Sequence, residues 1–230
     1  MIKYRMGLTK GEELRFISHL DYAEVIRRAI LRAKLPVNYS EGFNPHMKMT
    51  FLAALALGVT SDAEYMDVEL TEELPAQEIA ARLKPQLPNG VKLLKVKKVD
   101  INRPTRKAQP DMAVYQIDVP LNCDGAVSNK ADEALKKFAD SAEVIYQRIT
   151  PKKHQVFDVK QYLPQPIYYE VSGQSLKMSM NIRITPAGSV KAGEILQLLQ
   201  EDFQLPIDKE NALIHRQAVL FKNRPLTDWV

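Results

Sequence analysis

The stretch LKMSMNIRI, residues 176–184, has the clearest hydrophobic alternation in the chain. Every second residue from Leu176 to Ile184 is leucine, methionine or isoleucine, and the residues between them are polar or basic. Successive side chains of a strand point to opposite faces of a sheet, so this pattern predicts a half-buried strand with one face toward a core.

Segments with helical or strand periodicity flank this strand on both sides. Apolar residues recur at helical spacing in two of them, and the others alternate or are short and apolar. The elements predicted for this part of the chain are, in order, strand 113–119, helix 131–138, strand 144–149, a polar insertion at 150–166, strand 176–184, helix 195–203 and strand 212–221.

The first hundred residues predict the same order of elements. A helix is expected to begin near residue 19, because Ser18 and Asp21 fit the S-x-x-D capping pattern, and to end before Pro36. The predicted elements are strand 2–9, this helix, strand 47–51, strand 64–70, helix 75–83 and strand 91–99.

The order β-α-β-β-α-β is the ferredoxin-like arrangement. We therefore expect an α+β protein with two ferredoxin-like halves in tandem. The segment INRPTRKAQPD, residues 101–111, has two prolines, three bases and almost no apolar residues, and is the best candidate for a linker. The predicted domains are residues 1–100 and 112–230, the second with the insertion at 150–166.

Composition sets limits on the class of protein. With 230 residues and 45% hydrophobic residues, the chain is expected to be globular, with one large or two small domains. It contains no apolar run of about 18 residues, and its first residues do not resemble a signal peptide. Cys123 is the only cysteine, which excludes an internal disulfide and a cysteine-rich cluster. We expect a cytoplasmic protein without membrane segments.

Charge is segregated along the chain, although the formal net charge is only +4. Residues 51–74 contain six acids and no base, whereas residues 91–109 contain seven bases and only one acid, Asp100. Segregated charge can steer a polyanion to one face. Lysines at a strand edge that discourage aggregation are an equally good explanation.

The loop YSEGFNPHMKM, residues 39–49, combines turn-forming residues with an aromatic ring and bases. Ser40, Gly42, Asn44 and Pro45 are explained by a tight connection alone. An exposed Phe43, however, could stack on a nucleobase. His46 and Lys48 would then stand close enough to meet a phosphate.

The first predicted helix is the second candidate site. Arg27, Arg28 and Arg32 lie on its polar side and could bind phosphates or carboxylates. Glu24 stands four residues before Arg28, so a surface ion pair explains that arginine equally well. His19 falls in the first turn, where the helix dipole favours a neutral imidazole that could take part in proton transfer.

Common signatures of metal and nucleotide chemistry are missing from the sequence. The four histidines are widely scattered, and no pattern of metal ligands occurs. Glycine-rich phosphate loops and the G-x-S-x-G nucleophile motif are also missing. We therefore predict neither a metal site nor a bound cofactor.

The run FISHLDYAEVIRRAILRAKLPVNYSEGFNPHMKMTFLAALALGVTSDAEYMDVEL, residues 16–70, resembles the radical SAM-linked protein family, a bacterial domain of unknown function. The segments ITPKKHQVFDVKQYL and LIHRQAVLF resemble it more loosely. The motifs that carry the resemblance are Ser18-His19-Leu20-Asp21, Leu35-Pro36, Ser40 to His46, Leu57-Gly58-Val59 and Glu64-Tyr65-x-Asp67.

The resemblance implies a partner that is a radical S-adenosylmethionine enzyme. The three-cysteine motif of that enzyme is not in this chain, so the partner would be a separate protein. Together with the tandem fold and the aromatic loop, this leads us to expect an accessory protein that binds RNA as substrate. The expected binding residues are Arg15, His19, Arg27, Arg32, Ser40, Phe43, Asn44, His46 and Lys48.

Two alternatives remain open from the sequence. The chain could itself be an enzyme that uses His19 with Asp21 or Asp67 as acid–base groups. It could also be a protein-binding scaffold whose basic strand, residues 91–109, docks the partner.

Overall fold

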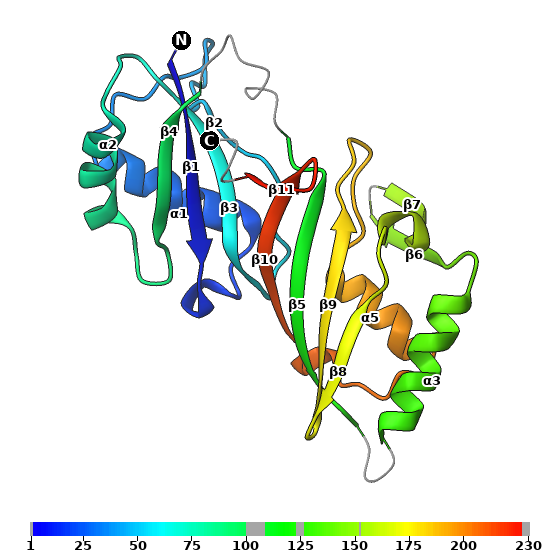
Figure 1. Ribbon diagram of the computed structural model, residues 1–230. Helices are drawn as coiled ribbons and strands as arrows, with labels where there is room; N and C mark the ends of the chain where they lie inside the picture. Colours follow the sequence, from blue (N-terminus) through cyan, green and yellow to red (C-terminus); the bar gives the residue numbers. More distant parts are fainter. Residues whose placement is uncertain (1, 100–108, 123–126, 152, 227–230) are drawn as a thin grey trace. The chain divides into compact units, whose positions relative to one another are not determined.

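The structure is a computed structural model that describes residues 2–99, 109–122, 127–151 and 153–226 (Figure 1). The chain divides into two compact units. The first comprises Met1–Pro110 and Arg216–Val230, and the second comprises Asp111–His215. No helix in the described part of the chain is long and apolar enough to cross a membrane.

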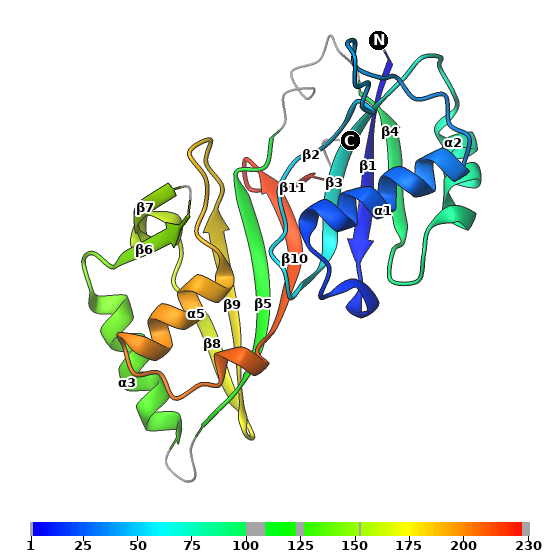
Figure 2. The ribbon, with the colours of Figure 1, turned by 180° about the vertical axis from the view of Figure 1, so that it is seen from behind.

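The first unit is an antiparallel sheet with helices on one face (Figure 2). Its strands run in the order β4-β1-β3, and both β2 and β10 pair along β3. The register places Met6 opposite Met66. The elements are β1 (Ile2–Lys10), α1 (His19–Arg32), β2 (Met49–Phe51), β3 (Val59–Leu70), α2 (Ala76–Leu83), β4 (Leu93–Lys98), the end of β10 (Leu213–Phe221) and β11 (Arg224–Pro225).

Helix α1 begins and ends where the sequence predicts. The Ser18 hydroxyl accepts a hydrogen bond from the backbone N–H of Asp21 at 3.1 Å, which satisfies one of the free amides of the first turn. Tyr22, Ile26 and Ile30 are buried against the sheet. After the helix, Lys34 takes a positive φ of 52°, and the chain then turns away through Leu35 and Pro36.

The central strands of the first unit are buried on both faces. On the helix side, Met66 and Val68 join Tyr4, Met6 and Leu8 in the main core. On the opposite face of the sheet lies a smaller cluster, made of Ala63, Tyr65, Val219 and Leu226. Because both faces of β1 and β3 are covered, their charged residues are buried as well as their apolar ones.

The second unit repeats the predicted order, with an insertion. Its strands run β5-β9-β8, and Ile117 stands opposite Met178. Strands β6 and β7 form a separate two-stranded sheet. The elements are β5 (Met112–Pro120), α3 (Val127–Asp140), β6 (Ile145–Thr150), β7 (Lys153–Asp158), α4 (Val159–Tyr162), β8 (Tyr168–Ser172), β9 (Ser175–Arg183) and α5 (Ala192–Glu201), after which β10 begins.

The α+β class with two ferredoxin-like halves is confirmed, but the second half differs in detail. The strand predicted at 144–149 is β6, which pairs with β7 and with no other strand in the described residues, and so belongs to the insertion. The strand that pairs with β9 in its place is β8, which the sequence did not predict. Its first three residues are all exposed, so it has no alternation to recognise.

The two units also differ from the predicted domains. Residues 216–226 group with the first unit, whereas the sequence placed them in the second domain. Most of the predicted linker, residues 101–108 of 101–111, lies outside the described residues, as does Cys123. The boundary falls after Pro110, at the end of that predicted linker.

Candidate functional site

The loop from Tyr39 to Lys48 is closed by its own hydrogen bonds. Tyr39 and Met47 form an antiparallel bridge at its base. The backbone N–H of Ser40 donates to the carbonyl of His46 at 2.9 Å, and the Ser40 hydroxyl accepts from the N–H of His46 at 3.0 Å. The same hydroxyl lies 2.7 Å from Nδ1 of His46. Gly42, at a φ of +115°, provides a backbone turn that side chains disfavour.

This loop presents an aromatic ring to solvent. Phe43 has a relative exposure of 106%, and Asn44 and His46 are also exposed. Met47 is buried and anchors the base of the loop in the main core. Lys48 forms an ion pair with Glu69 at 3.8 Å, so its charge is shared with an acid of the sheet. The predicted exposed loop therefore exists, and Phe43 is the most exposed of its large apolar residues.

The arginines of α1 differ in their partners. Arg27 and Arg28 both donate to the Glu24 carboxylate, at 2.6 and 2.7 Å, and these hydrogen bonds lower the pKa of Glu24 to about 2. Arg32 instead donates to the backbone carbonyl of Gln86 at 2.7 Å. Within the part of the chain that the structure describes, no carboxylate lies within ion-pair distance of Arg32. Its charge is therefore the most available of the three.

Arg15, predicted as a binding residue, is buried and fixed by its neighbours. Its guanidinium donates to both carboxylate oxygens of Glu12, at 2.7 and 2.6 Å, and to the carbonyl of Gly58 at 3.1 Å. The N–H of Gly58 returns a bond to the carbonyl of Arg15 at 3.0 Å. Arg15 thus ties the start of α1 to the loop before β3.

The structure does not bring His19 together with either predicted aspartate. Asp21 is exposed and completes the helix cap, where its carboxylate accepts from the Ser18 hydroxyl at 2.6 Å. Asp67 is buried in a bidentate pair with Arg5, at 2.7 and 3.0 Å, and its parity places it on the sheet face opposite α1. His19 itself packs edge-on against Phe51, with ring centroids 5.3 Å apart.

Beneath the start of α1, His19 lies beside a buried ionic cluster of Lys10, Glu64 and Arg216. Arg216 donates from Nε to Oε1 of Glu64 at 3.0 Å and also from Nη2, and it donates to the carbonyl of Ala54 at 3.0 Å. Lys10 donates from Nζ to two backbone carbonyls, at 3.1 and 3.0 Å. Oε2 of Glu64 and Nδ1 of His19 are buried without a hydrogen-bond partner.

Burial dominates the electrostatics of this cluster. Desolvation lowers the pKa of Lys10 and the pKa of His19, and Glu64 opposes both shifts. Desolvation also raises the pKa of Tyr22, whose hydroxyl donates to the carbonyl of Thr9 at 2.8 Å. Burial therefore favours the neutral form of His19, and the cause is desolvation, whereas the prediction from the sequence rested on the helix dipole.

The buried pairing of Glu64 with Arg216 was not predicted from the sequence. The sequence did contain an indication of this burial. In a strand, Glu64 lies on the same face as Met66 and Val68, and Arg216 lies on the same face as Ile214. Each is therefore a charged residue at an apolar-face position, which requires a buried partner. The partner is 152 residues away and could not be read from spacing.

Exposed apolar residues flank this cluster. Phe16, Leu20 and Leu57 have relative exposures of 79%, 79% and 63%. Phe16 follows Arg15 and Leu57 precedes Gly58, and these two neighbours are joined by reciprocal hydrogen bonds. We refer to Phe16, Leu20 and Leu57 as the apolar rim.

The acidic segment 51–74 does not form an unpaired acidic face. Four of its six acids have cationic partners that come from other strands or from the loop. The pairs are Glu64–Arg216, Asp67–Arg5, Glu69 with Lys3 and Lys48, and Glu73–Lys98. Among the residues described, no group of three or more histidine, cysteine or acidic side chains could hold a metal ion.

These features define an α+β protein of two ferredoxin-like halves with a buried ionic cluster and an exposed aromatic loop in the first unit. The chain belongs to the family described as uncharacterized protein conserved in bacteria (DUF2344), whose model matches residues 3–192. No curated protein matches the sequence.

Two solved structures are similar to this chain at low sequence identity. A Cbf5–Nop10–Gar1 complex matches with a TM-score of 0.52 and 12% identity, over 96% of this chain and 50% of that chain. An H/ACA ribonucleoprotein bound to a substrate RNA matches with a TM-score of 0.47 and 10% identity, over 93% of this chain and 46% of that chain. The chain thus spans about half the length of these structures.

Proposed function

We propose that this protein binds RNA through the loop 39–48 and acts in the cytoplasm as the substrate-binding partner of a separate radical SAM enzyme. The observation that carries the proposal is Phe43, which is fully exposed at the tip of a loop that is closed by hydrogen bonds. An exposed aromatic ring in a preformed loop can stack on a base at little cost in conformational entropy.

Positive charge for phosphate contacts lies where α1 ends, a few residues before the loop. Arg32 and Lys34 extend from this end, and the carbonyl of Lys34 accepts from Arg82 at 3.5 Å. Arg82 pairs with Glu78, whereas Arg32 and Lys34 have no ion pair with a described acid. Basic side chains without an acidic partner attract the phosphate backbone of RNA, and this attraction weakens as the salt concentration rises.

The similar structures support the proposal only through the fold. The Cbf5–Nop10–Gar1 complex, at 12% identity, is similar in fold alone. The RNA proposal therefore rests on Phe43 and on the basic residues Arg32 and Lys34. The experiment below tests the role of Phe43 and the dependence of binding on salt.

The radical SAM partner is supported by the motifs of residues 16–70 and by the apolar rim. Exposed apolar residues on a soluble domain commonly mark a protein-facing surface. The rim lies at the other end of α1 from Arg32. We therefore assign the rim to the enzyme and the loop to RNA.

Fluorescence anisotropy with a labelled single-stranded RNA tests the first assignment. At about 50 mM salt, Phe43→Ala should weaken binding by roughly 5- to 100-fold, and wild-type binding should fall further at about 200 mM salt. Phe16→Ala is the matched control, since it removes an exposed phenylalanine outside the loop. Absence of wild-type binding at the lower salt, or equal effects of the two variants, would overturn the RNA assignment.

Co-purification with the radical SAM protein tests the second assignment. Leu20→Asp should abolish capture of the enzyme and leave RNA binding intact, because Leu20 is exposed at the rim. Charge reversal at Lys95 and Lys97 tests the alternative in which the basic strand docks the enzyme. Loss of capture in that double variant alone would move the interface to β4.

A further inference from the structure

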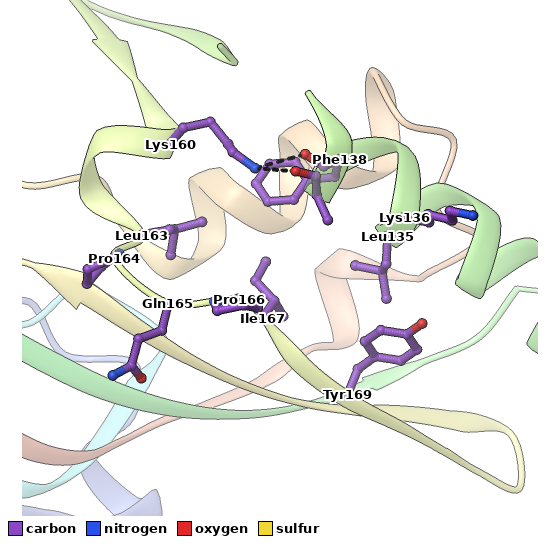
Figure 3. Close-up of a pocket in the computed structure, with 11 residues that line it drawn as sticks. Leu135, Lys136, Phe138, Lys160, Leu163, Pro164, Gln165, Pro166, Ile167 and Tyr169 are labelled. Carbon is purple, nitrogen blue, oxygen red and sulfur yellow. Dashed lines mark hydrogen bonds between the residues drawn. The ribbon is translucent and has the colours of Figure 1, made fainter. Parts of the chain in front are cut away.

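A pocket of about 370 Å³ lies in the second unit, between α3, α4 and the segment that leads into β8 (Figure 3). Its walls are mainly apolar, and Figure 3 shows Phe138, Leu163 and Ile167 directed toward its interior. The volume falls within the range of about 300–1,000 Å³ that is typical of small-molecule sites. None of its residues belongs to the loop 39–48 or to the apolar rim.

Two side chains of the pocket are fixed in place by hydrogen bonds. The hydroxyl of Tyr169 donates to Oδ1 of Asp132 at 2.8 Å, which orients the phenol ring along one wall. Lys160 donates from Nζ to the carbonyls of Phe138 and Ala139, at 3.1 and 3.0 Å, and its Nζ lies 4.8 Å from the centre of the Phe138 ring. The ammonium is thus held at the C-terminal end of α3.

The charged residues that line the pocket are all basic. Lys136 and Lys160 both line the pocket, and no acidic residue is among the lining residues. An ammonium group has three N–H donors, and two of those on Lys160 are used. Stabilisation of the helix end explains those two bonds, and the ring of Phe138 also lies against the ammonium. Among the described residues, the third donor has no hydrogen-bond acceptor, and the apolar walls play no part in stabilising the helix end.

We propose that this pocket binds a small amphipathic carboxylate, with an aromatic or branched aliphatic body against Phe138, Leu163 and Ile167 and its acid group at Lys160. The apolar walls select the body, and the fixed ammonium selects the charge. This site is independent of the RNA proposal, since it lies in the other unit and uses none of the same residues.

NMR titration of the full chain with three matched probes tests this proposal. Indole-3-acetate, neutral indole and tryptamine share one ring system and differ in charge. Indole-3-acetate should bind at the pocket with a Kd of about 1 mM or below, and about tenfold more tightly than tryptamine. Equal affinity for the anion and the cation, or no shifts at pocket residues, would overturn the proposal.

Two variants and a control separate the contributions of charge and cavity. Lys160→Met should lower the affinity for indole-3-acetate about tenfold and leave that for neutral indole unchanged, which also shows that the pocket remains folded. Ile167→Trp should fill the cavity and abolish binding of all three probes. Lys177→Met, on β9, removes one charge outside the pocket and should change nothing. Unchanged anion binding in Lys160→Met would refute the role of that ammonium.

Discussion

Glu64 and Arg216 are 152 positions apart in the sequence and form a buried ion pair within the first unit. The side chains of Glu64 and Arg216 are 0% and 2% exposed. Because the pair is removed from water, each charge depends on the other for its solvation. Loss of either partner should therefore cost far more than loss of a surface ion pair.

We expect Arg216→Met to lower the free energy of unfolding by about 3–5 kcal/mol, because it leaves the buried Glu64 carboxylate without the cation that is hydrogen-bonded to it. Urea denaturation measures this change. The double variant Glu64→Leu/Arg216→Met should recover much of the loss, since it removes both charges. A double variant as unstable as the sum of the two single variants would show that packing, and not charge, is responsible.

Acid should destabilise the protein partly through His19. Burial lowers the pKa of His19, while Glu64 opposes this shift and Arg216 and Lys10 add to it. Below the ordinary histidine pKa of about 6.5, the unfolded chain then binds a proton that the folded protein does not, so stability falls as the pH falls. The contribution of neutral His19 is complete above that pH.

The His19→Gln variant should therefore lose less stability than the wild type between about pH 7.5 and pH 5.5, as measured by urea denaturation at both values. The other three histidines are common to both proteins and serve as the internal control. An identical pH dependence of the two proteins would rule out a contribution of His19.

Ser40 should control the rigidity of the aromatic loop. Ser40→Ala removes the hydroxyl that accepts from the N–H of His46, at a cost of about 0.5–1.5 kcal/mol in local stability. Hydrogen exchange of the His46 amide should accelerate, and RNA affinity should fall because the loop is less preorganised. Thr50→Ala, at an exposed position of β2, should leave both measurements unchanged. Unaltered exchange at His46 would mean that the backbone bridge alone closes the loop.

The cap of α1 should matter more than the ion pairs on its surface. Ser18→Ala should destabilise the first unit by about 1 kcal/mol, because the N–H of Asp21 loses its acceptor. Glu24→Gln should cost less, since its bonds to Arg27 and Arg28 compete with solvent. Thermal denaturation of the two variants compares these effects. The reverse order would contradict the capping argument.

Most of the fold could be predicted from the sequence because strand alternation and helix capping are local patterns. The alternation at 176–184 and the cap at Ser18 depend only on neighbouring residues, and both lie where they were predicted. Strand β8 was missed because its exposed tyrosines give no alternation. Strand β6 was misassigned because a hairpin strand and a strand of the main sheet have the same local pattern.

The candidate site was predicted only in part, because long-range pairing is invisible in one sequence. The exposure of Phe43 followed from its turn-rich surroundings, and the structure agrees. The buried states of Arg15 and Asp67 did not, because each depends on a partner or a packing position that the fold supplies. The pocket in the second unit had no sequence signal, since its walls come from separated segments.

The return of the chain through β10 has a consequence for synthesis on the ribosome. Arg216 is the cation that neutralises Glu64, and it is translated after the whole second unit has been made. Until then, the interior of the nascent first unit contains a carboxylate that lacks its hydrogen-bonded cation. We therefore expect this unit to reach its final state only late in translation, after the unit that follows it in the sequence.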